Sequence, residues 1–180
     1  MRFTLLTAAA LLAASSAGLA QSTTLGSQNV GARIVNPITI TKDNGSTPQV
    51  DGQDLYFGRM VSPTTAGTIT LTPANAASFS GGLSASVGHT TPRYNIGATD
   101  GMVLSVAIAF PASVSNGTQT MALSAATFSE NGAAGAGTAS GGTFTWNTGD
   151  HIRIGGTLAV GANQAVGLYT NTYSVTVAYN

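Results

Sequence analysis

The sequence has no cysteine and few charged side chains. Without cysteine, neither a disulfide nor a thiolate zinc site can form, so the fold depends on side-chain packing and backbone pairing. Charged residues make up 7% of the chain, against about a quarter in ordinary soluble domains. Uncharged Thr, Ser, Asn and Gln must therefore supply most of the polar surface. This composition suits secreted all-β proteins and filament or surface-layer subunits better than soluble enzymes.

A cluster of basic residues is also lacking. Apart from Arg2, the chain has five basic and six acidic side chains, a formal charge of −1. Nucleic acids and anionic lipids are bound by clustered Lys and Arg. We therefore expect no nucleic-acid partner and no binding to an anionic membrane surface.

The first twenty residues have the organisation of a signal peptide. Arg2 precedes an apolar run from Phe3 to Leu12, and small residues lead up to Ala20. These are a charged n-region, an h-region and a small-x-small cleavage site. The run is shorter than the roughly 20 apolar residues of a membrane-spanning helix, which disfavours an uncleaved anchor. We expect cleavage after Ala20, which leaves 160 residues that cross the periplasm to the cell surface or the medium.

The remaining chain predicts one domain preceded by an arm. Residues 21–31 are rich in Ser, Thr, Gly and Asn, which is typical of a mobile segment. Residues 32–180 are enough for a single domain with a sizeable core.

Short apolar or alternating stretches, each bounded by Gly, Asn, Asp or Pro, fill this domain. After the signal peptide, no stretch has a capped helical period. The pattern predicts an all-β fold, a single Ig-like antiparallel β-sandwich. In the first stretch, alternation places Ala32, Ile34, Ile38 and Ile40 on one face, with Pro37 at an edge or a bend. The expected strands are 32–40, 55–61, 67–73, 83–87, 93–96, 103–110, 118–125, 142–146, 151–154, 157–160 and 168–179, with one turn at 74–77 and a flexible loop at 131–137.

No residues have the spacing of a catalytic or metal site. His89 and His151 are far apart in the sequence, and we interpret both as exposed residues at strand ends. Asp150 precedes His151 directly, so in a strand their side chains point to opposite faces and cannot form the hydrogen bond of a triad. Residues 43–45 and 51–54 resemble fragments of a calcium loop without its spacing, and we interpret them as turns. We expect no enzyme activity, no cofactor and no metal.

The C-terminal stretch from Gly167 to Asn180 has the clearest strand pattern. Aromatic and aliphatic residues occupy one parity, and Thr and Ser occupy the other. A period of two predicts one buried face, and at about 3.3 Å per residue a strand over 168–179 would span roughly 40 Å. The residues on the apolar parity are Tyr169, Tyr173, Val175, Val177 and Tyr179.

Three parts of the chain resemble the DUF4402 family of exported bacterial proteins. They are ARIVNPITI at 32–40, LYFG at 55–58 with GTITL at 67–71, and GGTL at 155–158 with GLYT at 167–170 and the stretch that follows. The resemblance implies export and a β-sandwich, but no settled biochemical function.

The C-terminal stretch is also similar to that of chaperone–usher fimbrial subunits and spore-coat-U-like proteins. Those chains end in a strand with glycine fourteen positions from the C-terminus, alternating apolar residues and a penultimate aromatic, which here are Gly167, the apolar parity and Tyr179. The resemblance implies a sandwich that lacks one strand. Its groove would be filled first by a periplasmic chaperone and then by the N-terminal arm of an identical subunit. The donor arm would run from Gln21 to Val35, with Val30, Ala32 and Ile34 pointing inward.

Two alternatives stay open. The chain lacks the disulfide and the large apolar arm residues of many fimbrial subunits, so residues 34–40 could instead complete their own sandwich and give a monomer. Such a monomer would be an adhesive or carbohydrate-binding module, in which Tyr56, Tyr94, Trp146 or Tyr169 stacks on sugar rings. Gly167 would also suit a turn or bulge that needs a positive φ. The sequence favours a non-enzymatic structural subunit of a surface filament.

Overall fold

The structure, a computed structural model, describes residues 29–43, 54–133 and 137–180. All regular secondary structure in these residues is β-strand, which confirms the predicted all-β class. No helix in the described ranges is long and apolar enough to cross a membrane. The expected signal peptide, most of the expected arm and most of the calcium-loop fragments lie outside the described residues. The strands are β1 (Thr39–Lys42), β2 (Gly67–Leu71), β3 (Ala77–Gly81), β4 (Arg93–Gly97), β5 (Val103–Ala109), β6 (Ser113–Ser115), β7 (Thr120–Glu130), β8 (Thr138–Ala139), β9 (Thr143–Thr145), β10 (His151–Val160) and β11 (Ser174–Tyr179).

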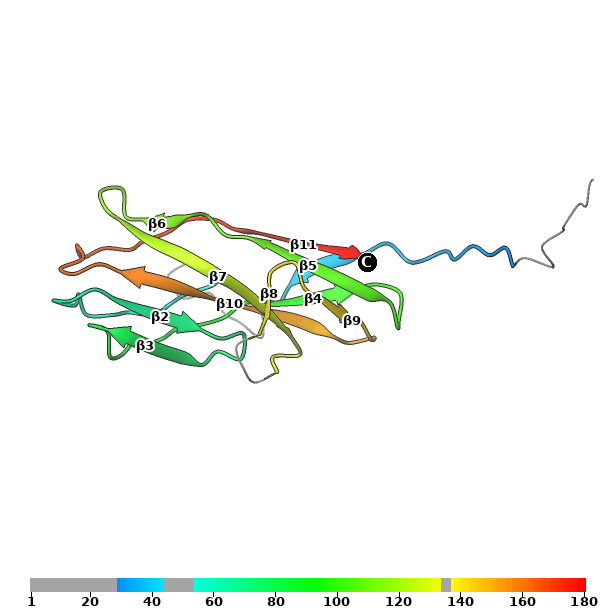
Figure 1. Cartoon of the computed structure of the whole chain (residues 1–180), viewed down its shortest axis with the longest axis horizontal. Coiled ribbons are helices and arrows are strands. Elements are labelled where there is room, and N and C mark those ends of the chain that lie inside the picture. Colours follow the sequence, from blue (N-terminus) through cyan, green and yellow to red (C-terminus); the bar gives the residue numbers. More distant parts are fainter. Residues whose placement is uncertain (1–28, 44–53, 134–136) are drawn as a thin grey trace, which may run out of the picture. The chain divides into compact units, whose positions relative to one another are not determined.

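Residues Ile34–Asn180 form one compact unit, in which the larger of two antiparallel sheets is organised around β10 (Figure 1). Along one edge β10 pairs with β7. Along its other edge it pairs first with β4 and then with β2. β1 extends the sheet beyond β4, β3 extends it beyond β2, and β6 and β8 pair with β7.

Two glycines make this change of partner possible. A Cβ atom at Gly155 would lie 2.2 Å from the backbone oxygen of Leu71, and one at Gly156 would lie 2.5 Å from the ring of Phe110. Both distances are too short for any side chain, so only glycine admits the neighbouring backbone and ring. The ladder with β7 shifts register between Gly155 and Thr157, which is a β-bulge beside the change of partner.

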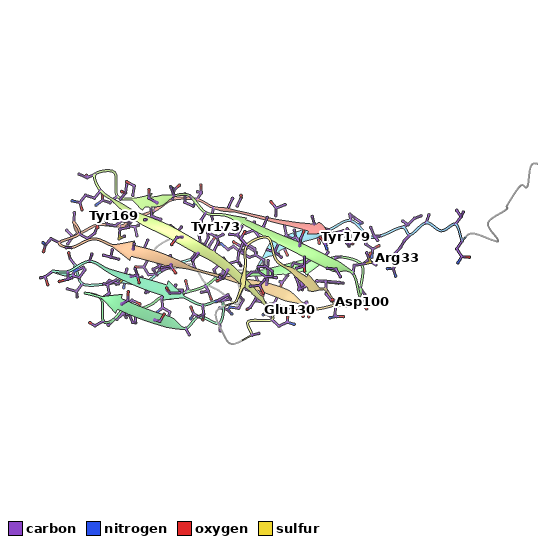
Figure 2. All side chains as sticks on the ribbon, in the orientation of Figure 1. Arg33, Asp100, Glu130, Tyr169, Tyr173 and Tyr179 are labelled. Atoms are coloured by element: carbon purple, nitrogen blue, oxygen red, sulfur yellow. The ribbon has the colours of Figure 1, made fainter. Side chains whose placement is uncertain are left out.

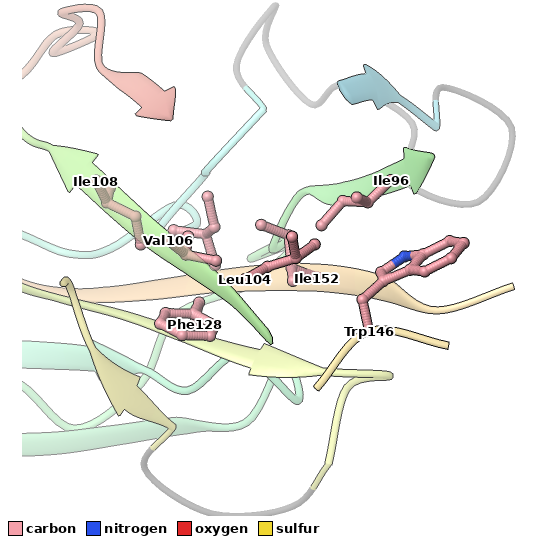
Figure 3. Close-up of a cluster of buried hydrophobic side chains, with 8 residues drawn as sticks. Ile96, Leu104, Val106, Ile108, Phe128, Trp146 and Ile152 are labelled. Atoms are coloured by element: carbon pink, nitrogen blue, oxygen red, sulfur yellow. The ribbon is translucent and has the colours of Figure 1, made fainter. Parts of the chain in front are cut away.

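The smaller sheet has the order β11-β5-β9, and it packs on the half of the larger sheet formed by β4, β7 and the first half of β10. Alternation in β5 points Leu104, Val106 and Ile108 into the core between the sheets (Figure 3). Burial of each such side chain contributes roughly 1.5–3 kcal/mol. Trp146, which directly follows β9, adds to this core from the side of the smaller sheet. From the larger sheet the core is completed by Ile96, Phe128, Ile152 and Ile154. The predicted antiparallel sandwich is confirmed.

A second core cluster lies over the other half of the larger sheet, where β2, β7 and the second half of β10 meet. It consists of Phe57, Ile69, Leu71, Leu83, Met121, Leu158 and Val160. No strand of the smaller sheet belongs to it. Segments outside the strands cover this cluster instead, and their residues Leu55, Met60 and Tyr169 pack against it.

Several predicted strands have other boundaries. The stretches 151–154 and 157–160 are one strand, β10, because the two glycines between them lie within the strand instead of ending it. The expected strand at 118–125 is part of β7, which continues to Glu130. The short strands β3, β6 and β8 were not predicted. The turn expected at 74–77 lies earlier, where Asn75 N donates to Thr72 O over 2.9 Å, and Ala77 is already the first residue of β3.

Two predicted strands are wrong. Residues 55–61 and 83–87 make only isolated bridges, at Tyr56 with Thr90 and at Arg59 with Val87. The reason is Gly58, whose φ of 92° breaks the extended backbone between the two bridges.

The N-terminal stretch also differs from its prediction. β1 begins only at Thr39, which pairs with Gly97. Pro37 lacks the N–H that a ladder needs, and Ile34 before it is exposed whereas Ile38 after it packs against the core between the sheets. The four residues expected on one face therefore do not share a buried face.

Candidate functional site

The buried face predicted for the C-terminal stretch is present, although the regular strand is shorter than predicted. β11 covers six residues, and Thr170 makes an isolated bridge with Ser115 of β6 before it. All five residues of the apolar parity are half-buried, and the Thr and Ser residues between them are exposed. Figure 2 shows Tyr169, Tyr173 and Tyr179 following one another along this segment.

The backbone of β11 is paired on one side only. β11 is the last strand of its sheet, and within the described residues it pairs with β5 alone. Asn180 N donates to Val103 O over 3.0 Å, which sets the phase of the antiparallel ladder. The N–H and C=O groups of Ser174, Thr176 and Ala178 therefore point toward β5. Those of Val175, Val177 and Tyr179 point to the outer edge, which we call the open edge.

An apolar groove of about 600 Å³ lies beside the chain that leads into β11. One wall is formed by residues 54–62 and the other by residues 164–173. Its floor is the second core cluster, where Met121, Leu158 and Val160 contribute side chains, joined by Val114 and Leu123. The groove therefore lies over the half of the larger sheet on which the strands of the smaller sheet do not pack.

Exposed aliphatic side chains stand on both walls of this groove. Val61 on the first wall is 87% exposed and Val166 on the second wall is 92% exposed, and Leu168 beside it is also exposed. Single exposed aliphatic residues are common on protein surfaces. Here three of them stand around one apolar groove, so together they form one exposed apolar surface.

The two walls run antiparallel and are held together at one end. Ser62 Oγ donates to Gln164 O over 2.8 Å, which joins them. Gln164 Nε2 donates to the Tyr169 hydroxyl over 2.9 Å, and this hydroxyl donates to Ala165 O over 2.8 Å. These bonds hold the second wall in a fixed shape although it is not a strand.

At the other end, two tyrosines separate the groove from the core between the sheets. The hydroxyls of Tyr94 in β4 and Tyr173 lie 2.7 Å apart, and the Phe110 ring meets the Tyr173 ring edge to face at 5.5 Å. Burial raises the pKa of Tyr173 far above its usual value, and the neighbouring Tyr94 raises it further. Burial also raises the pKa of Tyr94. Both hydroxyls therefore stay neutral, and beside them Lys42 forms an ion pair with Asp54.

The other predicted assembly residues lie apart from the groove floor. Gly167 has a φ of 151°, and a Cβ there would lie 3.1 Å from Asn116 Nδ2, so the local backbone alone already favours glycine. The predicted donor residues are exposed: Val30 is 99% and Ile34 is 96% exposed, and Ala32 is exposed as well. Their role as donors stays a prediction.

The predicted lack of contact between Asp150 and His151 can be compared with the structure. Asp150 accepts hydrogen bonds from Asn131 Nδ2 and Asn147 N, both at 2.7 Å, and makes none with His151. Burial lowers the pKa of His151, and the nearby arginines lower it further. Throughout the described ranges, no three His, Cys, Asp or Glu side chains come together as metal ligands.

The aromatic residues considered for sugar stacking are mostly buried or hydrogen-bonded within the domain. Trp146 is 4% exposed and belongs to the core between the sheets, and Tyr56 is also buried. Tyr94 and Tyr169 are half-buried, and their hydroxyls are hydrogen-bonded within the domain. Neither buried ring offers a free face for a sugar.

Sequence reasoning missed most of the groove. Residues 55–61 of the first wall were expected to form a strand, and Val61, Val166 and Leu168 were not singled out. Their exposure depends on which segments cover the larger sheet, so no local pattern in the sequence distinguishes them from core residues.

One comparison with known proteins gives a match. The sequence model of the domain of unknown function DUF4402 matches residues 47–179, which include both walls of the groove and β11. No curated protein and no solved structure matches the chain. Because the match spans more than half of the sequence, the chain belongs to the DUF4402 family.

Proposed function

We propose that this protein is a non-enzymatic, exported structural protein, a pilin-like subunit of a cell-surface filament that is assembled by strand addition. The observation that carries the proposal is the open edge of β11, which follows directly on an apolar groove. A signal peptide at residues 1–20 would export the chain, and a periplasmic chaperone would cover the groove before assembly.

The open edge supplies the backbone part of such a site. A strand beside β11 pairs with the outward N–H and C=O groups of Val175, Val177 and Tyr179. Edge strands with unpaired backbone groups are templates for another strand unless they are blocked. β11 has no proline and no charged side chain, so nothing in its sequence blocks pairing.

The groove supplies the side-chain part. In an added strand every second side chain points toward the domain, and successive inward side chains are about 6–7 Å apart. Strand addition gains affinity from backbone hydrogen bonds and specificity from such alternate side chains in pockets. The floor of Met121, Leu158 and Val160 suits aliphatic residues.

The donor that fits is the arm of a second copy. Val30, Ala32 and Ile34 have the spacing of alternate strand positions, and all three are exposed. Because donor and acceptor are different parts of the chain, the contact is head to tail and does not close on itself. Repetition of this contact produces a filament.

The test compares size distributions of residues 21–180 purified from the periplasm. Ile34→Asp places a charge on a proposed inward side chain, and Asn29→Asp is the matched control at an exposed position of the other parity. Burial of an unpaired charge costs several kcal/mol. We expect ladders for the wild type and Asn29→Asp, and monomer for Ile34→Asp.

All three proteins should unfold at the same temperature as monomers, because Ile34 makes little contact in the monomer. Wild-type protein that stays monomeric at high concentration would overturn the proposal. If Ile34→Asp formed the same ladder of oligomers as the wild type, the arm would not be the donor strand.

A further inference from the structure

A network of three hydrogen bonds fixes the backbone of Asn36. Asn36 N donates to Thr99 Oγ1 over 2.7 Å, and Asn36 O accepts from the Tyr179 hydroxyl over 2.7 Å. The same hydroxyl accepts from Thr99 N over 2.8 Å. Asn36 lies outside every strand, yet both its N–H and its C=O are engaged by residues far away in the sequence.

Asn36 marks the boundary between exposed and packed chain. Ile34 is almost fully exposed, whereas Ile38 packs against the core between the sheets. Pro37 fixes its own φ and restricts Asn36 to extended conformations. The three hydrogen bonds therefore hold the position at which the exposed chain begins.

Tyr179 takes part in two different surfaces. Its backbone N–H and C=O lie on the open edge of β11, and its ring is half-buried against the core. Its hydroxyl has one proton to donate and also accepts. It donates to Asn36 O and accepts from Thr99 N, so the penultimate residue ties residue 36 to the loop after β4.

We propose that Tyr179 is a positioning residue, whose hydroxyl together with Thr99 holds the root of the donor arm at Asn36. The proposal rests on the proposed strand-addition function. In each subunit the acceptor edge and the root of the donor arm then meet at one residue, which fixes where the arm leaves the domain relative to the edge that accepts the next arm.

The test uses Tyr179→Phe in the chain of residues 21–180. This variant keeps the ring in the core and removes both hydroxyl bonds. Amide exchange at Asn36 and Thr99 should accelerate by roughly five- to thirty-fold, as expected when one or two hydrogen bonds are lost from a local opening. Trypsin cleavage after Arg33 should accelerate too, because a protease must hold several extended residues on both sides of the cleaved bond.

Two further variants separate this role from a general effect on stability. Thr99→Val removes the acceptor of Asn36 N and should give the same acceleration of cleavage after Arg33. Thr148→Val is the matched control, since its hydroxyl donates to Asp100 and contacts neither Asn36 nor Tyr179. It should leave cleavage unchanged. The free energy of unfolding of each variant is measured with denaturant. This shows whether faster amide exchange at Asn36 reflects a local opening or a lower global stability.

A labelled peptide of residues 24–36 distinguishes this inference from the proposed function. Tyr179→Phe should bind the peptide within about twofold of the wild type, because strand pairing uses only the backbone of Tyr179. If neither protein binds the peptide, strand addition fails while the exchange data still decide the role of Tyr179. Unchanged exchange at Asn36 and unchanged cleavage after Arg33 in Tyr179→Phe would overturn the inference.

Discussion

The hydroxyls of Tyr94 and Tyr173 lie 2.7 Å apart and join the larger sheet to the segment that leads into β11. This contact stands where the closed part of the sandwich ends and the groove begins. The closed part is covered by β11, β5 and β9, whereas among the described residues no strand covers the groove. In the part of the chain that the structure describes, the strands of the second layer therefore cover only one half of the larger sheet.

The tyrosine pair should contribute measurably to stability. Tyr94→Phe and Tyr173→Phe should each lower the free energy of unfolding by about 1 kcal/mol, because each leaves the other hydroxyl half-buried without its partner. The double variant should lose less than the sum, with a coupling of about 0.5–1.5 kcal/mol. Denaturant unfolding of the four proteins measures this coupling, and strictly additive losses would show that the pair does not interact.

The inward parity of β11 should tolerate no charge. Val177→Asp places a carboxylate against the core between the sheets and should lower the free energy of unfolding by about 2–4 kcal/mol, with reduced accumulation in the periplasm. Ala178→Asp is the matched control, because Ala178 is exposed on the opposite parity. Equal accumulation of both variants would mean that β11 is not needed to close the sandwich.

The change of partner along β10 should require glycine at position 155. Gly155→Ala would bring a Cβ atom to 2.2 Å from the backbone oxygen of Leu71, and neither backbone can yield without breaking the ladder. We expect a loss of more than about 3 kcal/mol or failure to fold. Gly31→Ala has open space around its Cβ and should change stability by less than about 0.5 kcal/mol. Normal thermal unfolding of Gly155→Ala would contradict the register between β10 and β2.

Glu130 should make stability depend on pH. Partial burial, and then the nearby Asp150, raise the pKa of Glu130 above its usual 4.5. The native state therefore holds this proton more tightly than the unfolded state. The protonated carboxyl thus adds to the free energy of unfolding below pH 4.5, and this stabilisation is lost as pH rises through the raised pKa. As pH rises from 4 to 7, the free energy of unfolding of Glu130→Gln should therefore increase relative to that of the wild type. The increase should be less than about 1 kcal/mol, because the site is open to solvent.

Unfolding curves of both proteins at the two pH values measure this difference. If the difference in free energy of unfolding between the two proteins did not change with pH, ionisation of Glu130 would not affect stability. Asp150 responds in the opposite sense. Although burial alone would raise its pKa, hydrogen bonds from Asn131 and Asn147 lower it, so its contribution is lost only at lower pH.

Alternation in the sequence predicted the elements that have one face on the core. The C-terminal stretch and β2 were found in this way, because side-chain parity follows directly from strand geometry. Residues 55–61 look equally apolar but do not form a strand, since Gly58 interrupts them and both Tyr56 and Phe57 are buried. The pair Gly155 and Gly156 was interpreted as a strand boundary, because the close approach of Leu71 and Phe110 is a tertiary contact.

The candidate site was predicted in part. The apolar parity of the C-terminal stretch was identified from the sequence, whereas the groove was not. The groove depends on which strands pack over the larger sheet. That is a tertiary arrangement, and the residues of the two walls carry no local pattern that predicts it. The pairing of Asn36 with Thr99 and Tyr179 joins three distant segments, and it too has no local signal.

The most direct test of strand addition is amide exchange along β11 in the monomer and in the assembled protein. If β11 accepts a strand at its open edge, the amides of Ser174, Thr176 and Ala178 are protected in both states. The amides of Val175, Val177 and Tyr179 should exchange quickly in the monomer and become protected on assembly. Protection of Val175, Val177 and Tyr179 already in the monomer, or fast exchange of all three in the assembly, would contradict the claim that the open edge accepts a strand.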